Sequence, residues 1–300
     1  MTFLIRPLRF QFLAQDPIFF PAHKPGNILR GAFGHLFRDL ACRCPGEPHT
    51  ADCPYARIFE PKPVAGGPSG FANLPRPFVF RAAHLDGQRI APGEAFHFNV
   101  NLFSADPWPL SYFESTFARL ASEGLGPGRG RAQLQGMEAT VLELSLAPQP
   151  ANRVTVTFVT PTELKAAEGL ITQPLFEPLI ARLRDRIANL SQQYGNGPLE
   201  IDFPAFAHRA RQIQLSSSQI EQVAAERKSS RTGQTHPLSG FIGQATYSGE
   251  LGEFLPYLQI GQHTGVGRQT VWGKGELRIG WSARATSRRP KELSEGFPQK

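Results

Sequence analysis

"QIGQHTGVGRQTVWGKGELRI", residues 259–279, holds five glycines and three Lys or Arg side chains and ends in an alternating strand pattern. The helix pattern "LGEFLPYLQIGQHT" (251–264) ends inside this stretch, so its glycines connect a helix to a strand. Residues 123–134, "EGLGPGRGRAQL", are also rich in glycine and arginine and also lie between a helix pattern and a strand pattern. This internal echo predicts two units that are built alike.

The hydrophobic patterns of the first half follow the order strand, helix, strand, strand, helix, strand. They comprise a strand over 2–14, a helix over 26–42, strands over 76–83 and 94–103, a helix over 110–124 and one long strand over 131–146. This is the βαββαβ order of the ferredoxin-like fold.

The second half repeats this order after a polar, proline-rich linker, "APQPANR" (147–153). Its patterns are a strand over 153–164, a helix over 174–195, strands over 211–223 and 238–249, a helix over 251–264 and a strand over 274–281. The predicted fold class is therefore α+β, with two tandem ferredoxin-like (RRM-like, βαββαβ) domains over residues 1–147 and 153–285. Residues 286–300 show no periodicity and are expected to form a disordered tail.

The composition describes a globular chain with a basic excess. Apolar residues make up 40% of the 300 residues, and no run approaches the roughly 18 apolar residues of a membrane span. The 32 Lys and Arg outnumber the 25 Asp and Glu, and 18 of the 32 lie in residues 151–300. Such a positive field favours polyanions. We expect a cytoplasmic protein without membrane contact, because the N-terminal apolar run has no cleavage site of small residues.

The glycine-rich stretch 259–279 has two interpretations. Glycines let the backbone take positive φ, and successive exposed N–H groups form a nest that binds anions such as phosphates. The alternative is a tight helix-to-strand connection without a ligand. No G-x-x-x-x-G-K-[ST] motif occurs, and the glycines follow a helix, unlike those of a dinucleotide-binding loop. The first interpretation therefore indicates a nucleic-acid backbone as the ligand.

Tandem ferredoxin-like halves with a glycine-rich segment before the last strand resemble the RAMP superfamily of CRISPR proteins. "GFIGQATYSGEL" (240–251), followed by "YLQIGQHTGVGRQTVWGKGEL" (257–277), resembles the C-terminal signature of the CRISPR precursor-RNA processing endoribonucleases. "GNILRGAFGHLFRDLACRC" (26–44) and "CPYARIFE" (53–60) resemble the start of the same family, whereas much of the middle of the chain matches only in pattern.

The resemblance implies metal-independent cleavage of CRISPR repeat RNA in precursor transcripts, which gives mature guide RNAs. The 2′-OH attacks the adjacent phosphate and leaves a 2′,3′-cyclic phosphate and a 5′-OH. This chemistry needs a base, an acid and cations, and histidine suits proton transfer because its pKa lies near about 6.5. The family commonly carries its catalytic histidine on or just before the first helix, which indicates His35, with His23 and His263 as alternates. The alternative for each is a histidine without a catalytic role.

Basic and glycine residues near these positions are candidates for RNA contact. Arg30 and Arg38 flank His35 on the first helix, and Arg268 and Lys274 lie where glycine backbone and positive charge converge. The full predicted set is Arg30, Arg38, Arg129, Arg131, the hairpin residues Arg227, Lys228 and Arg231, and Gly265, Gly267, Arg268, Gly273, Lys274 and Gly275. For the charged members the alternative is a solvated basic surface.

Three cysteines lie within residues 42–53, a clustered and odd set that favours a reducing compartment over a disulfide framework. Cys42, Cys44, His49 and Cys53 offer three sulfurs and one imidazole, the ligand set of a closed structural zinc site. Their spacing, C-x-C-x4-H-x3-C, is not a standard one, and reduced thiols in a loop are the alternative. We expect no cofactor for cleavage itself.

Two other functions are consistent with parts of the sequence. A non-catalytic RAMP subunit that binds guide RNA in a CRISPR effector complex would share the fold and need no histidine. A zinc-stabilised protein-interaction module would explain the cysteines but not the basic second half. The expected partners are CRISPR repeat RNA, other CRISPR effector subunits and, in a homodimer, a second copy of the chain.

Overall fold

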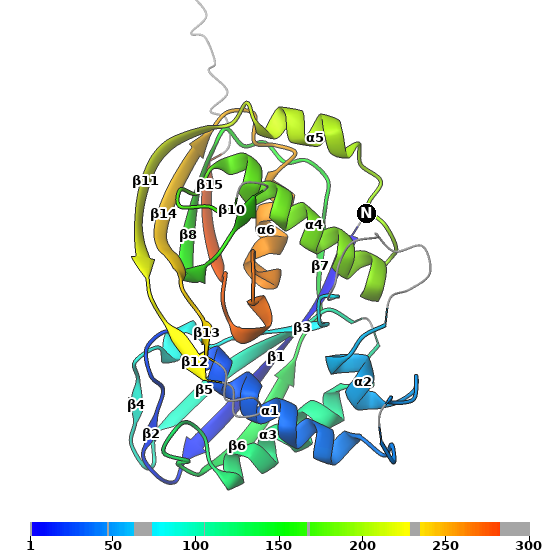
Figure 1. The fold of residues 1–300 in the computed structure, drawn as a ribbon, viewed down its shortest axis with the longest axis vertical. Helices are drawn as coiled ribbons and strands as arrows, with labels where there is room; N and C mark the ends of the chain where they lie inside the picture. The colour runs from blue at the N-terminus through cyan, green and yellow to red at the C-terminus, as the bar shows by residue number, and fades with distance from the viewer. Residues whose placement is uncertain are drawn as a thin grey trace, which may run out of the picture.

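The computed structural model describes residues 2–46, 48–62, 74–104, 106–166, 169–228 and 235–282. The main elements of the first half are β1 (Thr2–Ala14), α1 (Pro25–Ala41), β3 (Phe78–Arg81), β5 (Ala95–Leu102), α3 (Leu110–Glu123) and β6 (Ala132–Ala139). The strands form an antiparallel sheet in the order β3-β5-β1-β6, and α1 and α3 cover one of its faces (Figure 1).

The second half has the same plan. Its main elements are β8 (Arg153–Thr162), α4 (Phe176–Tyr194), β11 (Gln214–Val223), β14 (Gly240–Ser248), α6 (Leu255–Thr264) and β15 (Leu277–Ser282). The sheet order is β11-β14-β8-β15, so the first strand of each unit lies between the third and the fourth. This order, which the first half shares, confirms the predicted tandem ferredoxin-like fold.

Several shorter elements were not predicted from the sequence. They are α2 (Pro54–Phe59), α5 (Phe203–Ala210), the 3-10 turns η1 (Ala83–Leu85) and η2 (Thr270–Trp272), and the strand pairs β2 (Ile18–Phe19) with β4 (Arg89–Ile90) and β9 (Lys165–Ala166) with β10 (Gly169–Leu170). The short strands β12 (Glu226–Lys228) and β13 (Thr235–Pro237) form the hairpin that the sequence predicted. Of these, α2, η2 and the β12–β13 hairpin lie next to candidate functional residues.

The single strand predicted over 131–146 is instead two strands, β6 and β7 (Leu142–Ser145), which both pair with β1. The break falls opposite Pro7 of β1. Proline has no N–H to donate to a sheet ladder. The carbonyl of Pro7 accepts a hydrogen bond from the Thr140 N–H at 3.1 Å, between the two paired segments.

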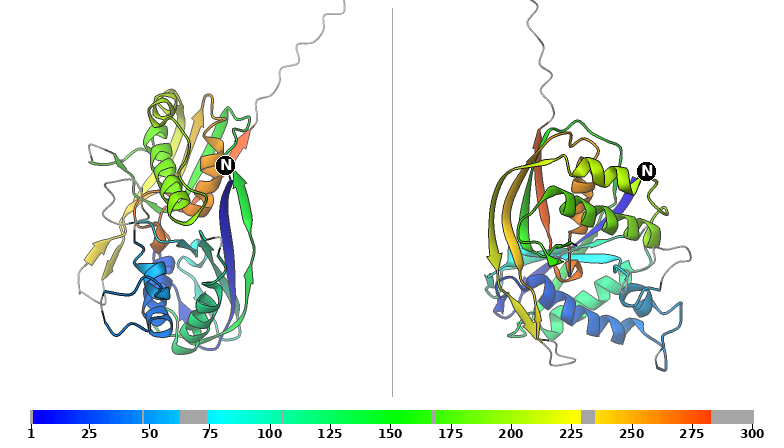
Figure 2. Two further views of the ribbon diagram at one scale, coloured as in Figure 1. Left: turned by 90° about the vertical axis from the view of Figure 1, so that its right-hand side faces the viewer. Right: turned by 45° about the horizontal axis from the view of Figure 1, so that its top comes forward.

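Strand β1 contributes side chains to two cores. Leu8 and Phe10 face the core under α1 and α3. Phe3 and Ile5 lie on the opposite face of the strand and belong to the core of the second half. Figure 2 shows β1 and β7 reaching from the first half toward the second. The two halves therefore share buried apolar surface in addition to the segment that joins them.

No helix in the described ranges is both long enough and apolar enough to cross a membrane. The tail predicted over 286–300, and Arg231 of the predicted hairpin, lie outside the described residues.

Candidate functional site

Residues 265–276, which we call the glycine loop, connect α6 to β15 and contain η2. The Arg268 N–H donates to the Glu163 carbonyl at 3.0 Å, and the Gly275 N–H donates to the Pro161 carbonyl at 3.2 Å. These donors are satisfied by the end of β8 and the residue that follows it. The anion nest suggested by the sequence is therefore wrong for these N–H groups.

The glycines of this loop permit close contact between backbone segments. A Cβ on Gly275 would lie 1.9 Å from the Val266 carbonyl oxygen, and one on Gly267 would lie 2.3 Å from the Glu163 carbonyl oxygen. Both residues also take positive φ, 68° and 81°. The tight connection, the alternative interpretation of the sequence, is thus what the structure shows, and contact of these glycines with RNA stays a prediction.

Three buried or half-buried side chains hold the carbonyl end of α6, directly before the glycine loop. Arg81 of β3 donates to the carbonyls of residues 262 and 263 at 3.2 and 2.9 Å, and Asn101 of β5 donates to the latter at 3.0 Å. Arg186 of α4 donates to the carbonyl of residue 264 at 2.9 Å. Cations are favoured at a helix C-terminus, where the last carbonyls lack partners within the helix. The loop is therefore fixed from both halves.

His263 lies in the last turn of α6, inside the helix predicted over 251–264. Gly265, with φ of 72°, ends the helix one residue after Thr264. Burial, with a further contribution from nearby Arg81, lowers the pKa of His263 to about 4. Its imidazole is therefore neutral at neutral pH and is a weak base.

Arg268 and Lys274 are both close to the buried carboxylate of Glu163. Arg268 Nη1 donates to Glu163 Oε1, and Lys274 Nζ lies 3.7 Å from Oε2. Lys274 also donates to the Ser239 carbonyl at 2.7 Å and to Gln269 Oε1 at 3.0 Å. Burial lowers the pKa of Lys274 to about 8, although Glu163 opposes this shift.

A pocket between the start of α1 and the glycine loop is lined by His23, Asp86 and Lys274, among other residues. His23 takes φ of 60°, and its N–H donates to Asp86 Oδ1. Its Nδ1 lies 3.5 Å from Asp86 Oδ2, which orients the ring. The tertiary fold thus brings a histidine, a carboxylate and a lysine from three distant segments to one pocket.

His35 is exposed on α1 and lies nine residues beyond Gly26, which lines that pocket. At about 1.5 Å of rise per residue, the two are about 13 Å apart along the helix. Arg30 and Arg38 do not extend freely beside His35, because their guanidiniums lie over aromatic rings of α2, 5.4 and 5.6 Å from the ring centroids. They hold α2 against α1.

A second pocket, which we call the basic groove, was missed from the sequence. It lies beside the glycine loop and α4, has a volume of about 790 Å³, and its basic lining comprises Arg76, Lys165, Arg182, Arg186 and Arg268. Burial lowers the pKa of Arg186 to about 9, so a bound anion would relieve an unfavourable charge there. In the sequence, the i, i+4 spacing of Arg182 and Arg186 in a predicted helix is the signal that could have indicated the basic groove.

Two family models match the chain, one in each half. Residues 156–277 match the family model of the CRISPR-associated endoribonuclease Cas6, and residues 3–155 match a family model described as an N-terminal domain. Residues 156–277 of the chain therefore form a Cas6 domain. The recognised signature and the glycine loop both lie within the Cas6 match.

Solved Cas6 structures share the fold. A Cas6 product complex has a TM-score of 0.56 at 16% identity, covering 92% of this chain and 99% of that chain. Thermus thermophilus Cas6 has a TM-score of 0.54 at 15% identity, with 93% and 99% covered. A partial Cas6-RT-Cas1–Cas2 complex has a TM-score of 0.59 at 12% identity, with 94% and 46% covered. No curated protein sequence matches the chain.

The N-terminal glycine segment (124–131) lies outside the Cas6 match and has different neighbours in the fold. Arg131 Nε donates to Asp16 Oδ2 at 2.7 Å on the surface, and Arg129 is exposed with φ of 50°. A Cβ on Gly130 would lie 2.3 Å from the Pro17 carbonyl oxygen. The two glycine segments therefore pack against different parts of the chain.

The predicted basic hairpin is present as the pair β12–β13, in which Arg227 is opposite His236. Arg227 and Lys228 lie in β12 itself, not at the tip. The views of Figures 1 and 2 agree that the hairpin lies beside α1.

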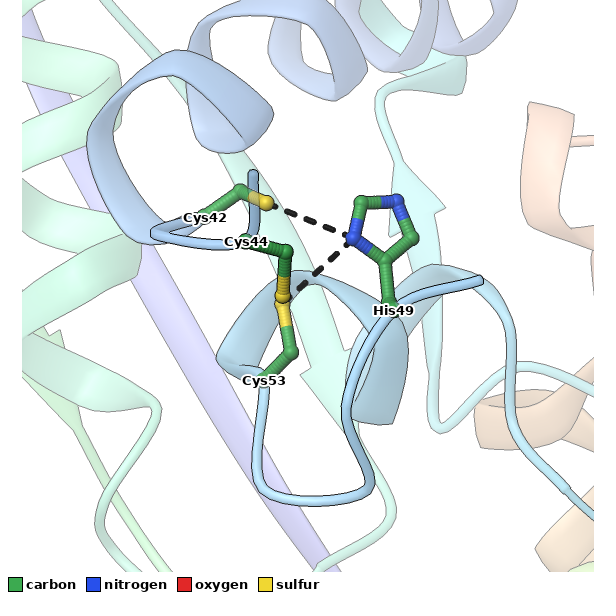
Figure 3. Close-up of side chains that lie close together, drawn as sticks. All are labelled: Cys42, Cys44, His49 and Cys53. Carbon is green, nitrogen blue, oxygen red and sulfur yellow. Dashed lines mark hydrogen bonds between the residues drawn. The ribbon is translucent and has the colours of Figure 1, made fainter. Parts of the chain in front are cut away.

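The four predicted metal ligands also gather at one place. Cys42, Cys44, His49 and Cys53 place their ligand atoms within 4.8 Å of one another, just beyond the end of α1 (Figure 3). This cluster lies at the opposite end of α1 from His23.

Proposed function

We propose that this chain cuts CRISPR repeat RNA in precursor transcripts by attack of the 2′-OH on the adjacent phosphorus. The O2′–P bond forms, the P–O5′ bond breaks, and the products carry a 2′,3′-cyclic phosphate and a 5′-OH. The Cas6 domain supports endonucleolytic processing of CRISPR RNA. The bond changes and the independence from metal are the proposal.

The pocket of His23, Asp86 and Lys274 is the observation that carries this proposal. The reaction moves one proton from the 2′-OH and another to the leaving 5′ oxygen, which an imidazole can do at neutral pH. Asp86 orients the His23 ring at 3.5 Å. Lys274 brings positive charge to the same pocket, where charge develops on the phosphate oxygens.

His35 is the second candidate, and it is the residue favoured by the sequence resemblance. Its ring is exposed on α1, and the β12–β13 hairpin lies near this helix. RNA lying across this helix would reach His35 without entering the pocket. His263 is the weakest of the three candidates, because burial already lowers its pKa to about 4.

We propose the basic groove as the main path of the RNA backbone, since five cationic side chains line it against two carboxylates, those of Glu163 and Asp185. Arg129 and Arg131, which are exposed, would extend this path over the surface of the first half. Arg227, Lys228 and Arg231 remain predicted RNA contacts. A solved complex contains Cas6 together with RT, Cas1 and Cas2, which supports other CRISPR proteins as partners.

The test is single-turnover cleavage of a labelled repeat RNA in EDTA by the parent chain and by His23→Ala, His35→Ala and His263→Ala. The variant that removes the proton-transfer group should lose about 10² to 10⁴ in rate while its RNA affinity changes little. We expect this loss for His23→Ala. A loss confined to His35→Ala would move the reaction to the exposed face of α1.

Two results would contradict the mechanism. Normal rates for all three variants would exclude proton transfer by any of these histidines. Tight RNA binding by the parent chain without any cut would favour the non-catalytic subunit that the sequence also allows.

A further inference from the structure

We infer that Cys42, Cys44, His49 and Cys53 bind one zinc ion, and that this ion joins the end of α1 to the start of α2. The inference concerns the folding of the chain and does not depend on the proposed cleavage reaction. It starts from the four side chains drawn in Figure 3.

The distances between the ligand atoms agree with the edges of a zinc tetrahedron. With a Zn–S distance of about 2.3 Å and a Zn–N distance of about 2.0 Å, tetrahedral angles give S···N edges of about 3.5 Å. His49 Nδ1 lies 3.4 Å from Cys42 Sγ and 4.0 Å from Cys53 Sγ. All four ligand atoms lie within 4.8 Å of one another, so one ion can reach them with small side-chain shifts.

The donor set favours zinc and a structural role. Three sulfurs and one imidazole suit zinc, whereas calcium and magnesium take oxygen ligands. The cysteines are free thiols, so no disulfide already links them. His49 and Cys53 are buried, with 5% and 4% of their surface exposed. Four protein ligands in a half-buried site complete the coordination of zinc and leave no position for a substrate.

The ion would add a cross-link between the end of α1 and the start of α2, beside the packing and cation–π contacts that already hold α2. Cys42 follows the last residue of α1, and Cys53 is the N-cap of α2. Helix α2 has six residues, too few for a stable isolated helix. Its Phe59 packs against Phe33 and Phe78 in the first core. Holding α2 in place therefore also holds one side of that core.

The position of the cluster separates it from the cleavage site. Helix α1 has 17 residues, so its two ends are about 25 Å apart. His23 precedes one end and the cluster follows the other. From here zinc cannot touch a phosphate held beside His23, and the same chain can be stabilised by zinc and yet cleave RNA without a metal.

The first test measures bound metal in the parent chain, purified under reducing conditions from zinc-supplemented cells. We expect about one zinc per chain by elemental mass spectrometry, released when a mercurial reagent modifies the thiols. Cobalt loaded in place of zinc should give the absorption of a tetrahedral cobalt–thiolate site. Absence of zinc together with absence of the cobalt spectrum would overturn the inference, as would a disulfide between two of these cysteines.

The second test uses His49→Ala, with His208→Ala on the exposed face of α5 as the matched control. His49→Ala should lose zinc or bind it weakly, alter the cobalt spectrum and lower the melting temperature, while His208→Ala should keep the zinc and the melting temperature of the parent. A His49→Ala chain with full zinc content and an unchanged cobalt spectrum would contradict the assignment. Should His49→Ala fail to fold, the cobalt spectrum of the parent chain still decides.

Discussion

The two glycine segments hold the same place in their units but do different work in the fold. Residues 124–131 pack within the first half, where Gly130 lies against the Pro17 carbonyl. The glycine loop, residues 265–276, lies where the two halves meet, and Gly273 packs against Gly26 of α1. Similar sequences thus make a local turn in one unit and a joint between units in the other.

The charged side chains near the two glycine segments also differ in their burial. Arg131 pairs with Asp16 on the surface, with 61% and 37% of the side chains exposed. Near the glycine loop, Arg81 and Lys274 are buried, with 8% and 3% exposed. Burial makes the loop's charges structurally important, because a buried ion without partners is costly. The following substitutions test this difference, beginning with the largest expected effect.

Gly275→Val should lower the free energy of unfolding by about 4 kcal/mol or more, because any Cβ meets the Val266 carbonyl and the positive φ is strained for valine. Gly128→Val in the N-terminal segment, where a Cβ has open space, should change it by less than about 0.5 kcal/mol. Chemical denaturation measures both. Equal losses would show that the two segments are equally constrained.

Arg81→Met should cost about 2 to 3 kcal/mol, because it leaves the carbonyl of residue 262 without its side-chain donor and leaves that of residue 263 with Asn101 alone. The control, Arg131→Met, removes an exposed ion pair and should cost less than about 1 kcal/mol. If the Arg81 variant unfolds at the same denaturant concentration as the parent, the helix end does not join the halves.

The buried lysine should make stability depend on pH. The pKa of Lys274 falls from 10.5 to about 8 on burial, so the folded chain binds fewer protons than the unfolded chain between these values. The cost of holding the ammonium is present below about pH 8 and disappears as pH rises. The stability of the parent relative to Lys274→Met should therefore rise by about 1 to 3 kcal/mol from pH 7.5 to pH 10.

Lys165→Met, at an exposed lysine, is the control for this pH series. Its stability difference from the parent should stay flat across the range. If the stability difference between the parent and Lys274→Met is also independent of pH, the pKa of Lys274 is not lowered in the folded chain.

The smallest effect concerns RNA affinity. Binding should weaken with salt, and Arg182→Ala in the basic groove should reduce the slope of log K against log salt by about 1. Arg129→Ala tests whether the N-terminal segment also touches RNA. We expect a smaller change there. An equal change in slope would give both glycine segments a place on the RNA path.

Most of the fold could be predicted because the pattern that specifies it is local. The alternation of apolar residues in β1 and their helical spacing in α1 can be recognised from the residues of each element alone. The two-strand break at Pro7 and the short helix α2 could not be predicted in this way, since a partner strand and a packing surface decide them. The cysteine cluster could be predicted because its members lie within residues 42–53.

The candidate cleavage site was only partly accessible from the sequence. Each of its histidines could be named, but His23, Asp86 and Lys274 are separated by up to 251 positions, and no periodicity relates them. For His263 the helix was predicted correctly, but only the tertiary structure shows the burial that lowers the pKa of this histidine to about 4.

By itself the sequence determined the order of strands and helices, the duplication of that order, the excess of positive charge and the set of candidate metal ligands, since each can be read from the chain without knowing its folded contacts. Only the tertiary structure decided that the glycine loop is a joint between the halves and that the N–H groups of Arg268 and Gly275 bond to carbonyls at the end of β8 and just after it. It also decided which histidine and which lysine share a pocket. Packing sets these distances, because a backbone group can hydrogen bond only to what the fold places beside it.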